Sequence, residues 1–161
     1  MRLGLLTAAD YGALFLATDR ARTELVRWFE WPDRITSSET AKAYIEEIQV
    51  NSRIRLWWLI YENGAPVGGV QLRLRDGGAS ASMPYWLVPC AQGRGVATAA
   101  VRGVIDIARH IGFQKAKFRI ALDNTRSRAL AVRLGFSPVG APTETAFRNG
   151  QQTSQTWEKV L

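Results

Sequence analysis

Residues 85–98 of the chain read YWLVPCAQGRGVAT. Apolar and aromatic residues open this stretch and predict a strand, residues 89–93 predict a loop, and a helix is predicted from about Arg94 to His110. Glycines in such a loop let a ligand approach the main chain closely. The first amides of a helix lack intrahelical acceptors and carry the positive end of the helix dipole. The stretch therefore predicts a site for a phosphate or diphosphate group.

Two other nucleotide-binding loops fit this sequence poorly. A P-loop needs the pattern G-x-x-x-x-G-K-[ST], and the chain contains no such run. Residues 93–98 begin like the dinucleotide fingerprint, but Thr98 stands where a third glycine or alanine is needed. About 20 residues further on, that fingerprint places an acidic residue, whereas this chain has Lys115, Lys117 and Arg119. A Rossmann-type site is therefore disfavoured.

The positive charge of the chain is concentrated around and after this loop. The net charge is +7, from 21 basic and 14 acidic residues. Residues 91–135 hold nine of the basic residues and two of the acidic ones, so the rest of the chain is balanced at twelve of each. Such a segment favours a polyanionic ligand. The alternatives are a solvated basic face or weak RNA binding, although the chain lacks the mixture of aromatic and basic residues typical of RRM domains.

Length and composition predict one soluble domain that spans residues 1–161. Hydrophobic residues make up 47% of the chain and charged residues 22%, as in globular proteins. No apolar run is long enough to cross a bilayer, and the N-terminus reaches Asp10 too early for a signal peptide, so a cytoplasmic protein is expected. Cys90 is the only cysteine and His110 the only histidine, so no cluster of metal ligands is present and no metal is expected.

Working outward from the loop, the hydrophobic patterns predict an α+β domain with a mixed central sheet of about six or seven strands and about four helices. Strands are predicted at residues 2–6, 54–62, 67–75, 80–88, 115–122, 136–139 and 153–160. Helices are predicted at residues 7–17, 25–29, 37–48 and 94–110, with a short one before Gly135. The stripes predicted to be buried are Ala41, Tyr44, Ile45 and Ile48, and Val101, Val104, Ile105 and Ala108. Pro84 removes a ladder donor from its strand and predicts a bulge there.

The loop and three other segments together resemble the GNAT superfamily of N-acetyltransferases. Residues 92–97, QGRGVA, match the Q/R-x-x-G-x-G/A loop of that superfamily. The likeness extends through residues 85–87 (YWL), the step Asp123-Asn124-x-x-Ser127, and residues 134–136 (LGF). In this combination the chain resembles the Rim-type branch, which acetylates the N-termini of ribosomal proteins. The resemblance implies a GNAT fold and an acetyltransferase that uses acetyl-CoA as its co-substrate.

The resemblance also assigns roles to main-chain groups. The CoA diphosphate would be bound by the backbone amides of Gln92, Gly93, Arg94, Gly95, Val96, Ala97 and Thr98. The main chain of Leu87 and Val88 would pair with the pantetheine arm as an added strand. An amide at one of these two residues would stabilise the oxyanion that forms when the amine attacks the thioester.

Several side chains receive roles in the same way. Asn124 would hydrogen-bond the pantetheine arm, and Ser127 would lie near the sulfur and protonate the departing thiolate. The alternative for Ser127 is a serine near the start of a short helix that bonds only to local backbone. Arg94, Arg128 and Arg133 are candidates for the region of the 3′-phosphate.

The chain departs from this branch at the positions where its relatives carry two glutamates. Ser82 replaces the first glutamate, and Ala146 stands where the second one aligns. Glu144 lies two residues from Ala146 and shares its strand face if that strand is regular, which makes Glu144 a candidate base. The alternative for Glu144 is a solvated loop acid. The departure weakens the assignment to N-terminal acetylation in particular.

Without a strong base, amines of low pKa are the easier acceptors. An α-amine with a pKa of about 7.7–8.0 is roughly one-tenth neutral at pH 7, whereas a lysine amine near 10.4 is neutral in about one molecule in 2,500. This favours a protein N-terminal α-amine. The alternatives are a small-molecule amine, such as an antibiotic, polyamine or amino acid, and a basic RNA- or ribosome-binding module. Trp28, Phe29 and Trp31 would either form an apolar wall at the acceptor or pack as ordinary core. The sequence leaves both a monomer and a homodimer open.

Overall fold

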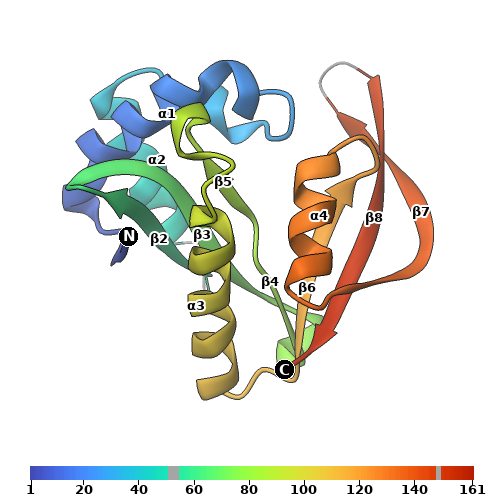
Figure 1. The fold of residues 1–161 in the computed structure, drawn as a ribbon. Helices are drawn as coiled ribbons and strands as arrows, with labels where there is room; N and C mark the ends of the chain where they lie inside the picture. The colour runs from blue at the N-terminus through green and yellow to red at the C-terminus, as the bar shows by residue number, and fades with distance from the viewer. Residues whose placement is uncertain (51–54, 148–149) are drawn as a thin grey trace.

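The computed structural model describes residues 1–50, 55–147 and 150–161 of the chain. Within these residues the centre is a mixed sheet of eight strands in the order β1-β2-β3-β4-β6-β8-β7, with β5 paired to β3 alone (Figure 1). The strands are β1 (Arg2–Leu5), β2 (Arg55–Glu62), β3 (Ala65–Arg75), β4 (Ser80–Ser82), β5 (Tyr85–Leu87), β6 (Lys115–Ala121), β7 (Ser137–Phe147) and β8 (Gly150–Val160). Ile54, the predicted first residue of the second strand, lies outside the described residues. The predicted α+β class with a mixed sheet is confirmed.

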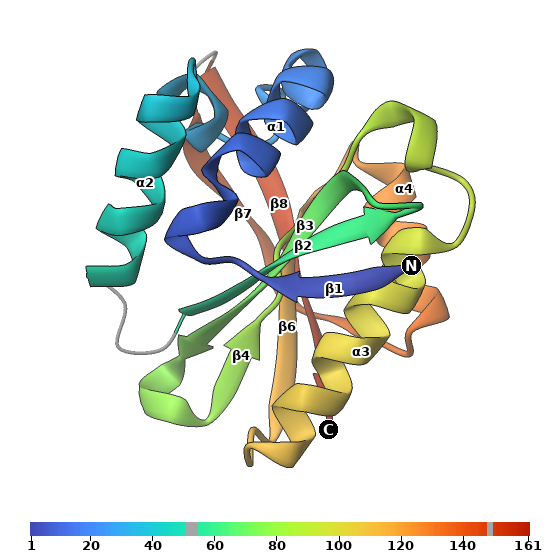
Figure 2. The same cartoon turned by 90° about the vertical axis from the view of Figure 1, so that its left-hand side faces the viewer.

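Four α-helices of the described residues cover the sheet in two layers. They are α1 (Tyr11–Leu25), α2 (Ser38–Val50), α3 (Val96–His110) and α4 (Thr125–Arg133). Figure 2 shows α1 and α2 on one side of the sheet and α3 and α4 on the other. Both predicted stripes, in α2 and α3, are buried. Each large side chain in these stripes contributes about 1.5–3 kcal/mol when it is fully buried.

The first helix is longer than predicted. The sequence predicts a helix that ends near residue 17 and a second helical segment over residues 25–29, but α1 runs without a break to Leu25, and Trp28 and Phe29 follow in a turn. Its buried residues are Leu14, Ala17, Thr18, Ala21 and Leu25. These residues repeat at helical spacing, but three of them are small or polar, so the stripe is inconspicuous in the sequence.

The strand predicted over residues 80–88 is divided in two, which raises the strand count above the expected six or seven. β4 pairs in parallel with β6, whereas β5 pairs only with β3. The division falls at Met83, whose N–H donates to the Lys117 carbonyl (3.2 Å), and at Pro84, which has no N–H to donate. The predicted irregularity at Pro84 is therefore a separation of strands rather than a bulge. Figure 1 shows β5 and β6 diverging from the end at which β4 and β6 meet.

The C-terminal hairpin is also longer than predicted. β7 continues to Phe147 and β8 begins at Gly150, whereas the sequence predicts strands over residues 136–139 and 153–160. The pairing of β7 with β8 shifts register between Val139 and Thr143 and then continues regularly. Gly140 and Pro142 interrupt the alternation of the sequence at this shift and conceal the second half of β7.

Candidate active site

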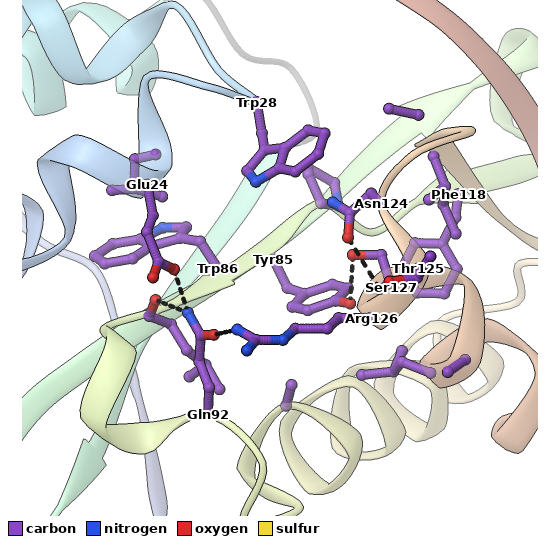
Figure 3. Close-up of a pocket in the computed structure, with 18 of the residues that line it drawn as sticks. Glu24, Trp28, Tyr85, Trp86, Gln92, Phe118, Asn124, Thr125, Arg126 and Ser127 are labelled. Atoms are coloured by element: carbon purple, nitrogen blue, oxygen red, sulfur yellow. Dashed lines mark hydrogen bonds between the residues drawn. The ribbon is translucent and has the colours of Figure 1, made fainter.

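A cleft of about 1040 Å³ opens where β5 and β6 diverge. Its walls are β5 and the following loop on one side, and β6 with the start of α4 on the other (Figure 3). The end of α1 and the turn after it close one end, where Glu24, Trp28 and Phe29 line the cleft. The cleft therefore brings together segments from residue 24 to residue 152.

The loop that the sequence singles out forms the mouth of α3 at this cleft. Gly93 and Gly95 have φ values of 74° and 80°, which L-residues with a Cβ rarely adopt. Gly95 is the N-cap, so α3 begins at Val96, two residues later than predicted. No side chain of the described residues caps this end, and the helix starts at the cleft wall, which residues 95–98 line. Its first amides and the positive end of the helix dipole are therefore available to an anion.

The edge of β5 that faces away from β3 also borders the cleft. The Val88 N–H donates to the Val67 carbonyl of β3 at 2.9 Å. Successive main-chain groups in a strand point to opposite edges, so the Leu87 N–H and carbonyl point into the cleft. The Leu87 carbonyl accepts a hydrogen bond of 3.4 Å from Gln92 Nε2, in agreement with this direction. Of the two predicted main-chain partners for a pantetheine arm, Leu87 offers its N–H to the cleft and Val88 does not.

Ser127 lies on the opposite wall, where two bonds hold it. Asn124 is the N-cap of α4, and its Oδ1 accepts the Ser127 N–H at 3.1 Å. The Tyr85 hydroxyl donates to Ser127 Oγ at 2.9 Å across the cleft (Figure 3). Burial raises the pKa of Tyr85, and the bond to Ser127 opposes that shift. Local sequence patterns give no sign of this hydroxyl contact, because it joins two segments 42 residues apart.

A polar bridge crosses the cleft beside the loop. Gln92 Nε2 donates to Glu24 Oε2 at 2.7 Å, and Arg126 Nη1 donates to Gln92 Oε1. Figure 3 shows the Arg126 side chain reaching from α4 towards Gln92. Arg126 thus places a cation next to the mouth of α3. Sequence patterns do not distinguish it from the other arginines of the basic segment. A second bridge joins Arg27 to Asp123, whose charged atoms are 2.9 Å apart.

The three arginines named for the 3′-phosphate lie in different surroundings. Arg133 lines the cleft. Arg94 lies outside the lining and forms an ion pair of 3.2 Å with Glu62. Arg128 also lies outside it and donates to the Leu122 carbonyl at 3.1 Å. The structure therefore brings one of the three to the cleft, together with Arg126.

Glu144 does not line the cleft. It is exposed and pairs across the hairpin with Thr153. Gln152, the next residue of β8, does line the cleft. Because adjacent residues of a strand point to opposite faces, Glu144 points away from the face that Gln152 presents. The strand pairing at Glu144 follows the register shift and is regular there.

The three aromatic residues that follow α1 lie in different surroundings. Trp28 and Phe29 line the cleft, whereas Trp31 packs away from it, against Tyr44, Trp57 and Trp86, with ring centroids 5.5–6.1 Å apart. Trp31 therefore packs as core, and an apolar wall of Trp28 and Phe29 at the acceptor stays a prediction.

Other features of the chain lie outside the cleft lining. Cys90 is exposed, and His110 is the last residue of α3. Among residues 1–50, 55–147 and 150–161, no group of three or more His, Cys, Asp or Glu side chains is arranged to hold a metal ion. None of the helices in that part of the chain combines the length and apolarity needed to cross a bilayer.

A mixed sheet that opens at one strand, with an uncapped helix start at the opening, defines the chain as a domain of GNAT architecture. The sequence model of the family described as acetyltransferase (GNAT) domain matches residues 1–137 of the chain. The chain therefore belongs to the GNAT acetyltransferase family.

Known proteins similar to the chain differ in the acceptors that their names give. A mycothiol acetyltransferase from Beutenbergia cavernae is 30% identical to the chain over 86 residues. These residues are 52% of this chain but 29% of that protein, so the chain spans under a third of the length of the mycothiol acetyltransferase. A RimL ribosomal L7/L12 α-N-protein acetyltransferase in complex with coenzyme A superposes with a TM-score of 0.88 at 17% identity, covering 99% of this chain and 93% of the other. The microcin C7 self-immunity acetyltransferase MccE, in complex with acetyl-CoA and AMP, superposes with a TM-score of 0.86 at 21% identity, covering 99% of this chain and 92% of the other.

Proposed function

We propose that the protein transfers an acetyl group from acetyl-CoA to a primary amine by direct attack in a ternary complex, with a protein N-terminal α-amine as the favoured acceptor. The observation that carries this proposal is one cleft that holds three groups the reaction needs. They are the uncapped amides at the start of α3, the inward-facing N–H of Leu87, and the hydroxyl of Ser127.

The donor lies along the β5 side of the cleft. Its diphosphate is bound by the amides of residues 92–98, with the Arg126 guanidinium beside them. The pantetheine arm pairs with the free edge of β5 as an added strand, using the Leu87 N–H, and Asn124 donates to it from its Nδ2. Arg133, which lines the cleft, is the candidate among the three named arginines for the 3′-phosphate.

The chemistry then requires few groups. A neutral amine attacks the thioester carbonyl, and the developing oxyanion is stabilised by a main-chain N–H such as that of Leu87. The tetrahedral intermediate collapses, the carbon–sulfur bond breaks, and the Ser127 hydroxyl protonates the leaving thiolate while it recovers a proton from solvent. The proton lost by the amine passes to solvent. No covalent intermediate on the protein forms.

The structure offers no support for a carboxylate base at Glu144, because its side chain lies outside the cleft lining. An acceptor that is already partly neutral avoids the need for such a base. An α-amine with a pKa of about 7.7–8.0 meets this condition at pH 7, and a lysine side chain near 10.4 does not. This difference supports the N-terminal acceptor.

A small-molecule amine is the second candidate. It is favoured by the name of the mycothiol acetyltransferase, the curated relative that is 30% identical over half of this chain. The test of both is the release of CoA from acetyl-CoA with N-terminal peptides, polyamines, amino acids and aminoglycosides, with the acetylated product identified by mass spectrometry. Acetylated peptide α-amines support the first acceptor class, a single small-molecule product supports the second, and no acetylated amine overturns the proposed activity.

A further inference from the structure

On the α1/α2 side of the sheet, three arginines gather around Tyr44. Arg34 lies with its guanidinium carbon 5.0 Å from the centre of the Tyr44 ring and is bonded to Glu47. Arg55 and Arg73 are partners across β2 and β3, so their side chains share one face. Burial raises the pKa of the Tyr44 hydroxyl, and the positive charges of Arg73, Arg55 and Arg34 oppose that shift. Among the described residues, Glu47 is the one carboxylate bonded to this group.

Arg73 makes one side-chain hydrogen bond and no ion pair within the described residues. It is half-buried, and its Nε donates to Gln71 Oε1 at 2.6 Å. Burial, followed by the positive charge of Arg55, lowers the pKa of Arg73 to about 10. The side chain therefore stays charged at neutral pH. A guanidinium has five N–H donors, and a cation removed from water without a counter-ion is costly.

The same face carries further donors that lack acceptors within the described residues. The indole nitrogens of Trp57 and Trp86 are buried and make no hydrogen bond there. Both lie within 2.8 Å of the point that a Cβ on Gly69 would occupy, so they converge on one spot. Gln71 is 3% exposed, and its carbonyl oxygen accepts the bond from Arg73. Buried unpaired donors are rare in native proteins and call for a physical explanation.

This donor-rich face begins at the wall of the cleft. Trp86 and Pro84 line the cleft, and the Pro84 carbonyl accepts the Gln71 N–H at 2.9 Å. Arg73 lies two residues further along β3, about 7 Å at the spacing of a strand. The face is on the α1/α2 side of the sheet, while α3 and α4 are on the other side (Figure 2). Arg73, Arg55 and Gln71 do not themselves line the cleft, and their face reaches it through Trp86 and Pro84. An acceptor that enters from the α1/α2 side, opposite to CoA, would pass this face.

We propose that Arg73, Arg55 and Gln71 form a subsite for an anionic group carried by the acceptor. This inference rests on the proposed function, because it specifies which amine is acetylated. A carboxylate or phosphate accepts the paired N–H groups of a guanidinium in a planar fork. Such a group has two sources: an acidic side chain next to the N-terminal residue of a peptide, or a small amine that also carries a carboxylate. A polyamine, which carries only positive charge, is a poor ligand for this face.

The test compares matched acceptors that differ only in the anionic group. One arm uses peptides that begin Ser-Asp-Asp and Ser-Asn-Asn, and the other uses 4-aminobutyrate and butylamine. We expect the wild-type protein to show at least tenfold higher kcat/KM for the anionic member of one arm, and that arm identifies the source. Arg73→Gln should abolish the preference, and Arg73→Lys should keep part of it. Arg102→Gln removes one charge from an exposed position on α3, on the other side of the sheet, and should leave the preference unchanged.

Two results would overturn the subsite. Equal kcat/KM for anionic and neutral acceptors in both arms is one, and a preference that survives in Arg73→Gln is the other. Circular dichroism and thermal unfolding establish whether Arg73→Gln is folded, and Arg55→Gln provides the same comparison if it is not. Acetylation without an anion preference refutes only the subsite, whereas a failure to acetylate any amine refutes the proposed function as well.

Discussion

The Tyr85 hydroxyl donates a hydrogen bond of 2.9 Å to Ser127 Oγ across the cleft. The Ser127 N–H is bonded to Asn124 Oδ1 at 3.1 Å, so both the main chain and the side chain of the serine are held in place. A hydroxyl oxygen that accepts a hydrogen bond from Tyr85 keeps its own O–H for a second acceptor. In the proposed reaction that second acceptor is the leaving thiolate.

This arrangement makes Tyr85 a positioning residue for Ser127. Ser127→Ala should lower kcat roughly a hundredfold or more, because a proton donor is lost. Tyr85→Phe keeps the ring that packs on Phe118 and should lower kcat about tenfold, the effect of one hydrogen bond of about 1.4 kcal/mol. KM for acetyl-CoA should change little in both variants. In a Ser127→Ala background, Tyr85→Phe should have no further effect; additive losses would show that the two residues act independently.

The mouth of α3 should tolerate no side chain at Gly95. Gly95 is the residue just before α3, and Gly112 follows Ile111 at the other end of the helix. Both glycines have positive φ (80° and 92°), and both have open space where a Cβ would be. Alanine at either position should cost about 1–2 kcal/mol of stability. Only Gly95→Ala should weaken CoA binding, measured by calorimetry, because only its Cβ projects at the diphosphate. Equal CoA affinities in the two variants would argue against a diphosphate at this mouth.

Arg126 should contribute to binding of the diphosphate. Arg126→Ala removes a charged hydrogen-bond donor from the cleft, a change of about 1.5–3 kcal/mol, or roughly a ten- to hundredfold rise in the Kd for CoA. Pantetheine lacks the diphosphate, so its affinity should not change. Arg128→Ala, on the same helix but outside the cleft lining, is the matched control. A similar loss of affinity for CoA and for pantetheine would place the role of Arg126 elsewhere.

Glu144→Gln should leave kcat/KM within about twofold of the wild-type value at pH 7. The reason is the position of this exposed side chain, which faces away from the strand face that contributes Gln152 to the cleft. Initial rates with the best amine acceptor measure the effect. A loss of a hundredfold or more, restored at high pH, would identify Glu144 as the general base after all.

Local patterns predicted much of the fold because the helices concerned bury regular apolar stripes. Val101 and Val104 repeat at helical spacing and lie inside α3 as expected. In α1, the stripe is carried partly by Thr18, which is fully buried, and a polar residue hides the period. The separation of β4 from β5 depends on their pairing with different strands, which Pro84 signals but does not determine.

The residues themselves predicted the main-chain part of the candidate site, whereas the side chains of Asn124 and Ser127, which also line the cleft, followed from the family resemblance. Glycines at 93 and 95 indicate a close approach of backbone to ligand, and the structure places both at the cleft wall. Side chains that meet across the cleft are a different matter, because the contact between Gln92 and Arg126 joins residues 34 positions apart. Charge alone did not separate Arg126 from Arg94 or Arg128, since all three lie in the same basic segment.

A crystal structure of the protein with bound CoA tests the central claim most directly. The account predicts diphosphate oxygens within about 3 Å of the amides at the start of α3, and a pantetheine arm along β5 that is bonded to the Leu87 N–H. A diphosphate bound elsewhere on the molecule, with the start of α3 filled by the protein's own side chains, would contradict it.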